Sequence, residues 1–331
     1  MNEMHLKPGD PVTIIRESNN SLSIVPNAVR SPSSNNEVTA LMLQDESGNS
    51  LKRKVVSMYL SGYNIMHLKS KTGRINSSQR DAVREAVRTE IIADASDLIT
   101  IQVLLNLPEL SVNTAVRRMF LISTAMHKDA MASLAEQSYD LARTILKSDD
   151  EVDRFSLYIL RNLVMATKNE RMLQEIGLRG PSDSLSYRVA VRSIERVADH
   201  AAGIADKCLN ITEKISKEAF QKLDKMSRIS LALLNDSVEA FLRRDYYLAD
   251  SIVDKTEGIR SLENEIILFL DKEKTSSSTL HESTNVYIKL ILEDIRRTAE
   301  HASDIAEAAM NETVSEVIEK IPSRERKVVA Q

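Results

Sequence analysis

The sequence is poor in the residues that interrupt or cross-link a chain. Its 331 residues include eight glycines, seven prolines and one cysteine, Cys208, and tryptophan is absent. No proline lies between Pro108 and Pro181 or between Pro181 and Pro322. Because an interior proline breaks a helix, both stretches can form long helices. A lone cysteine excludes a disulfide within the chain and fits a reducing compartment.

Excess charge and long apolar runs are also missing. The 48 acidic and 44 basic residues give a net charge of −4, so global charge indicates neither nucleic acid nor an anionic membrane as a partner. No apolar run approaches the roughly 18 residues that cross a bilayer, and the N-terminus has no apolar signal core. We therefore expect a cytoplasmic protein without membrane insertion.

Apolar residues follow helical spacing from about Ser77 onwards. Residues 82, 83, 86, 87, 91 and 92 are apolar, which predicts one buried helical stripe in a connecting segment over 77–109. The helices predicted after Pro108 begin at Ser111 and then cover about 149–169, 184–215, 219–243, 246–272 and 283–311. Three helices followed by three more predict two three-helix bundles packed as one α domain.

One helical motif occurs twice. Residues 194–201 read IERVADHA and residues 295–302 read IRRTAEHA. His200 corresponds to His301, 101 residues further along, and Asp153 corresponds to Arg260, 107 residues further along. Self-similarity at this range indicates that one helical unit was duplicated, so the two halves can be compared position by position.

Four acids of the first copy have the spacing of metal ligands. Asp149 and Asp153 are four residues apart, as are Glu195 and Asp199, so each pair lies on one helix face. If the two helices are neighbours, the pairs converge into hard oxygen ligands suited to Mg, Mn, Ca or iron. Salt bridges to Arg192 and Arg196 are the competing interpretation. Spacing alone does not separate the two.

The corresponding positions of the second copy are Thr256, Arg260, Arg296 and Glu300. One acid remains of four, and two arginines stand where ligands would be, so we predict no second cluster. His200 and His301 match each other, which indicates packing or capping as much as chemistry. The chain has no Glu-x-x-His, no Walker-type glycine loop and no Gly-x-Ser-x-Gly, so we expect no enzyme.

These motifs resemble the PhoU phosphate-uptake regulators, in which a segment like 194–205 follows an acidic turn like 149–153. The resemblance covers roughly residues 110–311. It implies a regulator of phosphate homeostasis that lowers phosphate import by contacting a phosphate ABC transporter ATPase or a sensor kinase. It also favours a divalent or iron-type metal at Asp149, Asp153, Glu195 and Asp199. We further expect a homo-oligomer, such as a homodimer.

The N-terminal residues alternate between apolar and polar at Val12, Ile14, Leu22 and Ile24, which predicts a β-hairpin. This piece resembles the second half of an AbrB/SpoVT swapped hairpin, a fusion that archaeal-type PhoU proteins often carry. The 331 residues do not include the preceding strand and basic loop that meet DNA in that family, so we expect either that the start was assigned late or that the module has lost its DNA-contacting part. An AbrB-class transcriptional regulator with a PhoU-like sensor domain is therefore the alternative, and it requires the missing strand.

The predicted fold is mainly α, with two tandem pseudo-symmetric three-helix bundles after a β-rich AbrB-like remnant and a mixed α/β connector. The predicted boundaries are 1–30 for the hairpin, 31–76 for the linker and connector, 77–109 for the connecting helical segment, 110–215 and 216–312 for the two repeats, and 313–331 for a charged tail.

Overall fold

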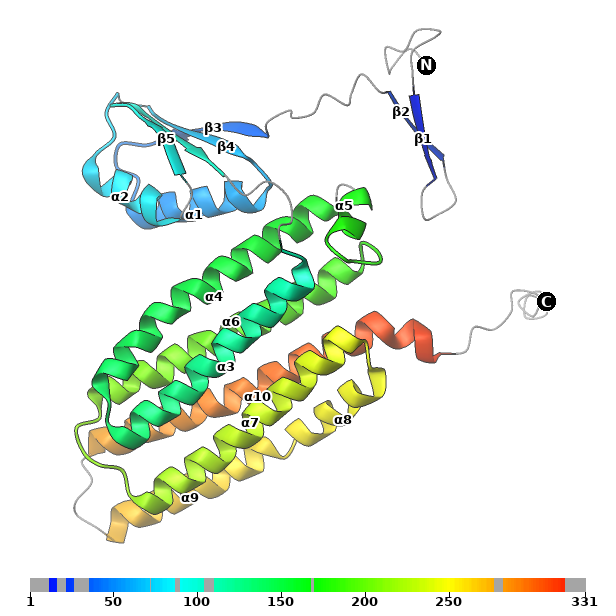
Figure 1. Cartoon of the computed structure of the whole chain (residues 1–331). Coiled ribbons are helices and arrows are strands. Elements are labelled where there is room, and N and C mark those ends of the chain that lie inside the picture. Colours follow the sequence, from blue (N-terminus) through cyan, green and yellow to red (C-terminus); the bar gives the residue numbers. More distant parts are fainter. Residues whose placement is uncertain are drawn as a thin grey trace, which may run out of the picture. The chain divides into compact units, whose positions relative to one another are not determined.

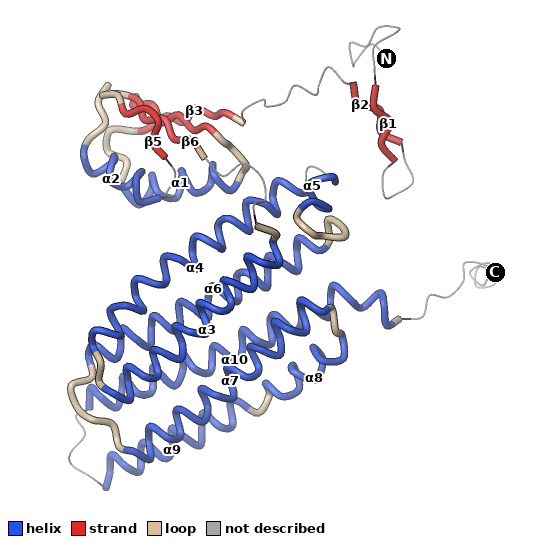
Figure 2. Tube along the Cα trace, in the orientation of Figure 1, coloured by secondary structure: helices blue, strands red, loops and turns tan. Residues whose placement is uncertain are grey.

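Strands lie in the first third of the chain, and long helices form the remainder (Figure 2). The computed structural model describes residues 12–16, 22–26, 36–71, 73–86, 90–103, 110–167, 170–276 and 282–318. Contacts divide the chain into two units, Met1–Asn106 and Leu107–Gln331.

The hairpin predicted near the N-terminus is present. Strands β1 (Val12–Arg16) and β2 (Leu22–Pro26) pair antiparallel, with Ile14 opposite Ile24. The other residues of the predicted 1–30 module lie outside the described residues.

A four-stranded mixed sheet with two helices follows in the first unit. Its elements are β3 (Glu37–Met42), α1 (Gly48–Leu60), β4 (Ile65–Ser70), α2 (Ser77–Ala86), β5 (Glu90–Asp94) and β6 (Leu98–Gln102). The strand order is β3-β4-β6-β5, with β3 parallel to β4 and β6 antiparallel to both of its neighbours. Both helices lie on one side of the sheet (Figure 1).

The helical connecting segment predicted over 77–109 is wrong beyond Ala86. Residues 90–94 and 98–102 are strands, and β6 is held between β4 and β5 by ladders on both sides. Ile99, Thr100 and Ile101 are all buried, as expected of a central strand covered on both faces. Pairing with β4, some thirty residues away, thus decides the structure of a segment whose apolar spacing also fits a helix.

The second unit has the predicted order of helices (Figure 1). The first repeat holds α3 (Val112–Glu136), α4 (Tyr139–Ala166), the short α5 (Glu170–Glu175) and α6 (Asp183–Asn210). The second holds α7 (Lys217–Arg243), α8 (Tyr246–Thr256), α9 (Ile259–Ser276) and α10 (Glu282–Val317). The prediction of two tandem three-helix bundles is confirmed.

Equivalent helix ends support the duplication. α3 ends at Gln137 with a φ of 54°, and α7 ends at Arg244, 107 residues later, with a φ of 61°. Both residues adopt the left-handed conformation common at helix C-termini. Ser111 and Ser216 cap the starts of the same two helices by accepting from Thr114 N and Ala219 N.

The helices differ most from the sequence prediction at three places. α4 begins at Tyr139, ten residues before the predicted start, because Ser138 caps it. The second helix of the second repeat is broken between α8 and α9, where Gly258 stands. α10 continues to Val317 into the predicted charged tail, with Thr313 buried.

The last helices of the two repeats, α6 and α10, pack antiparallel. Lys207 Nζ, late in α6, lies 2.8 Å from Asp294 Oδ2, early in α10, whereas Ser193 Oγ, early in α6, lies 3.5 Å from Asp304 Oδ2, late in α10. The rings of His200 and His301 stack at a centroid distance of 5.5 Å. Equivalent residues meet at the axis that relates two copies, so this pair marks the pseudo-twofold axis.

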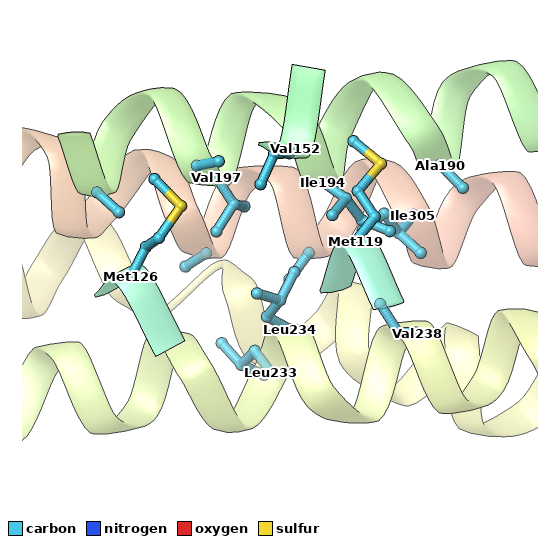
Figure 3. Close-up of a cluster of buried hydrophobic side chains, with 14 of the residues drawn as sticks. Met119, Met126, Val152, Ala190, Ile194, Val197, Leu233, Leu234, Val238 and Ile305 are labelled. Atoms are coloured by element: carbon cyan, nitrogen blue, oxygen red, sulfur yellow. The ribbon is translucent and has the colours of Figure 1, made fainter. Parts of the chain in front are cut away.

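One hydrophobic core is continuous across both bundles (Figure 3). Met119 of α3, Val152 of α4 and Ile194 of α6 belong to it together with Leu234 of α7 and Ile305 of α10. The repeats therefore share a core, as expected for one α domain.

Candidate functional site: an acidic cluster between two helices

The four predicted ligands lie on two packed helices of the first repeat. Asp149 and Asp153 are on α4, and Glu195 and Asp199 are on α6. Ser156 Oγ of α4 donates to Glu195 Oε2 at 3.2 Å, which places the facing turns of the two helices opposite each other. The structure thus places the two acidic pairs on neighbouring helices, which is the condition under which their spacing predicts convergence.

The negative charges at this place are only partly compensated. Burial raises the pKa of Asp149 to about 6, with further contributions from the charges of Asp153, Asp199, Asp150 and Glu195. Burial likewise raises the pKa of Asp153 to about 6, followed by Glu195 and Asp199. Like charges that approach one another favour the protonated form. The cluster therefore holds more negative charge than its surroundings neutralise.

Arginines satisfy the α6 half of the cluster. Arg192 pairs with Glu195, and Arg196 Nη1 lies 3.1 Å from Asp199 Oδ2. On α4, by contrast, Asp149 Oδ1 is fully enclosed and has no hydrogen-bond partner. The salt-bridge interpretation therefore explains the two acids of α6 and leaves Asp149 unexplained.

No three histidine, cysteine or acidic side chains are arranged as a ready metal-binding group within the described ranges. The carboxylates share a place without forming a finished coordination shell. Hard oxygen donors with an unpartnered, enclosed oxygen are nevertheless the chemistry that a divalent or iron-type ion requires. The metal site remains a prediction.

The equivalent place in the second repeat is filled by ion pairs. Arg296 Nε lies 3.0 Å from Glu263, Arg260 Nη2 lies 3.2 Å from Glu300 Oε1, and Arg297 Nη1 lies 2.6 Å from Glu300 Oε2. Burial alone would raise the pKa of Glu300, but hydrogen bonds from Arg297, Arg296 and Arg260 hold it below its usual value. Thr256 Oγ1 donates to the carbonyl of Val253. Guanidinium groups here supply the positive charge that the first repeat lacks.

Sequence reasoning missed a row of polar contacts between α6 and α10 around the two motif histidines, which we call the polar seam. His200 Nδ1 lies 2.9 Å from Asp294 Oδ1, and His301 Nδ1 lies 3.0 Å from Asp304 Oδ2. Both carboxylates are on α10, and their counterparts on α6 are Ser193 and Gly203. Aligning the repeats residue by residue would have shown a carboxylate at these two positions in the second repeat only.

Gly203 makes room for the seam. A Cβ at this position would lie 3.3 Å from Asp294 Oδ2 and 3.3 Å from Lys207 Nζ. The third histidine, His127, is fully buried beneath, where its Nε2 lies 2.9 Å from Ser227 Oγ. Burial lowers the pKa of His127 to about 4. It is a packed, neutral core histidine.

The matches between this chain and known proteins lie in the helical unit. The PhoU domain family matches residues 116–208 and 223–309, one segment in each repeat. The chain is 29% identical over 197 residues to the phosphate-specific transport system accessory protein PhoU homolog 1 of Thermotoga maritima, covering 58% of this chain and 80% of that protein. It is 25% identical over 173 residues to the PhoU homolog of Aquifex aeolicus, covering 49% of this chain and 74% of that protein.

Two solved structures share the fold. The phosphate transport system regulatory protein PhoU from Streptococcus pneumoniae has a TM-score of 0.53 at 22% identity, covering 63% of this chain and 96% of that one. PhoU from Pseudomonas aeruginosa also has a TM-score of 0.53, at 20% identity, covering 60% and 93%. The family match lies within the helical unit, so it gives no support to the AbrB resemblance of residues 1–30. Of the helices that the structure describes, none combines the length and apolarity needed to cross a bilayer.

Proposed function

Because the chain belongs to the PhoU domain family, we propose that it is an accessory regulator of phosphate transport and homeostasis. The observation that carries this proposal is the match of both repeats, in order, to a family whose similar members are phosphate-specific transport system accessory proteins. The finer proposal is that the protein lowers phosphate import by binding a transporter ATPase or a sensor kinase.

Removal of the gene in the source organism tests this function. Uptake of radiolabelled phosphate in phosphate-replete cells should rise and should return to its original level when the chain is supplied again, while sulfate uptake stays constant as a control. The purified chain should also bind the purified ATPase of the phosphate transporter or the kinase in sedimentation velocity. Unchanged phosphate uptake in the deletion strain would contradict the proposal.

We also propose that the acidic cluster holds a divalent or iron-type cation. The support is electrostatic: four carboxylates on facing helix turns, two of them with a pKa raised to about 6, and an enclosed oxygen of Asp149 without a partner. A cation that binds only the folded protein stabilises it by mass action. Metal removal should therefore lower the melting temperature.

Elemental analysis with matched variants tests the metal. Glu195→Gln or Asp199→Asn should reduce the bound metal, whereas Arg296→Lys, at the position equivalent to Glu195, should leave it unchanged. Absence of stoichiometric metal, together with unchanged melting after chelation, would return the four acids to the salt-bridge interpretation.

A further inference from the structure

One arginine of α6 lies beside the acidic cluster and acts on most of it. Arg192 pairs with Glu195. The pKa of Arg192 is raised by this hydrogen bond and then by the charges of Glu195, Asp199 and Asp153. Burial raises the pKa of Asp153, and the charge of Arg192 opposes that rise. A single guanidinium group therefore compensates part of the charge of three of the four acids.

The contact that holds Arg192 at the cluster is weak. Half of its side chain is exposed, at 50%, and among the described residues Glu195 is the acid with which it forms an ion pair. A half-exposed ion pair between two long side chains contributes little to stability, because water solvates both partners and both lose rotamer freedom. Arg192 can therefore leave the cluster for solvent at small cost.

The second repeat holds its cation much more firmly. Arg192 corresponds to Glu293. Glu195 corresponds to Arg296, so the two charges of this pair are exchanged between the repeats. The side chain of Arg296 is only 15% exposed, and it pairs with three carboxylates of α9 and α10. The cation of the second repeat is fixed in place, whereas that of the first can be exchanged.

Arg192 and a metal ion would use the same negative charge. Glu195 Oε1 faces Arg192, and Glu195 Oε2 accepts from Ser156 at 3.2 Å, so both oxygens of this carboxylate already have a partner. A guanidinium group and a metal cation also repel each other, because both are positive. A metal ion that enters the cluster therefore has to displace Arg192 or bind against its charge.

We propose that Arg192 is a displaceable counter-cation of the metal site proposed above, and that it lowers the affinity of the acidic cluster for metal. The salt-bridge and the metal interpretations of the four acids are then two states of one site. Without metal, Arg192 pairs with Glu195. With metal, its guanidinium group is released to solvent, so metal binding changes the charge that α6 presents at its surface.

The affinity of the full chain for Mn²⁺ tests this role. In isothermal titration calorimetry at pH 8, Arg192→Gln should bind Mn²⁺ roughly tenfold more tightly than the unchanged chain, which is about 1.4 kcal/mol. Arg192→Lys keeps the positive charge and should bind with an affinity close to that of the unchanged chain. Glu195→Gln removes a ligand and should weaken binding, which identifies the measured ion as the one in the cluster.

Arg228→Gln on α7 is the matched control. Arg228 also pairs with a carboxylate of its own helix, Asp224, and its side chain is 79% exposed. The variant removes an arginine and breaks an ion pair of the same kind, but in the other repeat. It should leave the affinity for Mn²⁺ unchanged.

The melting temperature gives a second readout. In chelator, Arg192→Gln should melt below the unchanged chain, because the cluster loses its counter-cation. With saturating Mn²⁺ this difference should disappear, because the pair between Arg192 and Glu195 no longer contributes to the metal-bound state. A residue with only a structural role would lower the melting temperature equally in both conditions.

Circular dichroism shows whether each variant is folded, and Arg192→Met, which keeps the apolar stem, takes the place of Arg192→Gln if that variant does not fold. Equal affinity of the uncharged variant and the unchanged chain would overturn the proposal. Weaker binding would also overturn it, since Arg192 would then hold the ligands in position. If neither the unchanged chain nor any variant binds Mn²⁺, the metal site and this inference both fail, while the phosphate-uptake test of the proposed function stands apart.

Discussion

Replacement of Asp153 by asparagine should stabilise the metal-free protein at neutral and alkaline pH. The acidic cluster costs free energy when all its carboxylates are ionised, because burial and then the neighbouring charges disfavour the ionised form. Asparagine has nearly the same shape as aspartate and carries no charge. The variant therefore removes both the burial of a charge and its repulsion by Glu195 and Asp199, while it keeps the packing of α4 against α6.

The magnitude follows from the pKa of Asp153, which rises from 3.8 to about 6. A rise of two units would correspond to roughly 3 kcal/mol at most, since one unit is 1.36 kcal/mol. Asp153 is exposed on one side, so solvent screening reduces this ceiling to about 1 kcal/mol. In a helical unit of this length, 1 kcal/mol shifts the melting temperature by roughly 2–4 °C.

The raised pKa of Asp153 fixes the direction in which the stability of the protein changes with pH. The folded protein binds the proton of Asp153 more tightly than the unfolded chain, so stability is lost as the pH rises from about 4 through 6. Calorimetry in chelator at pH 8 should show Asp153→Asn melting above the unchanged chain, and at pH 4 the difference should vanish. With metal added the order should reverse if Asp153 is a ligand, because the variant loses the stabilisation that binding gives.

An equal increase at pH 4 and pH 8 would refute the electrostatic argument, since the effect would then be independent of charge. A lower melting temperature in chelator at pH 8 would also refute it. Asp140→Asn is a suitable control, because this α4 carboxylate is 99% exposed and should shift the melting temperature little.

Three further outcomes are expected. Arg296→Met should destabilise the second repeat by about 2–3 kcal/mol in urea unfolding, because Glu263 and Glu300 lose a shared, largely buried partner; a change below 0.5 kcal/mol would contradict this. Since the pKa of His127 is lowered to about 4, its contribution to stability is complete above pH 6.5 and falls by about 3 kcal/mol towards pH 4. The His127→Asn variant should lack this fall in stability. Identical pH profiles of stability for the variant and the unchanged chain would contradict the prediction. Burial raises the pKa of Cys208 to about 11, so iodoacetamide at pH 8 should modify the native protein far more slowly than the denatured chain, and comparable rates would show that the thiol is accessible.

Local sequence signals were sufficient to predict most helices of the helical unit. The long proline-free stretches and the 3.6-residue apolar period are properties of neighbouring residues, and helices depend mainly on these. The two acidic pairs were also predictable, because four-residue spacing places each pair on one helix face, but their convergence depended on the packing of α4 against α6, which spacing alone does not give. The start of α4 was missed because the capping signal at Ser138 was overlooked, although Asp140 in its first turn is typical of a helix start.

The sheet and the seam depend on residues that are distant in sequence. Residues 90–102 contain enough apolar residues to fit a helical stripe, but β6 pairs with β4 and β5, and no local pattern announces that pairing. The seam likewise joins His200 to Asp294, nearly a hundred residues away. Its position could be inferred only once α6 and α10 were known to cross at the matching histidines.

Position relative to the pseudo-twofold axis explains why the repeats diverged unevenly. His200 and His301 stack on each other at the axis, so a change in one alters the surroundings of the other, and both were kept. The acidic positions lie off the axis, and the ion pairs at these positions are made within one repeat. The charge at such a position can therefore differ between the repeats, as it does between Glu195 of the first repeat and its counterpart Arg296 of the second. Reversal by a single substitution is unfavourable, because Arg296 lies between Glu263 and Glu300. Its replacement by glutamate would bring three carboxylates together, with cations only at Glu300, from Arg260 and Arg297.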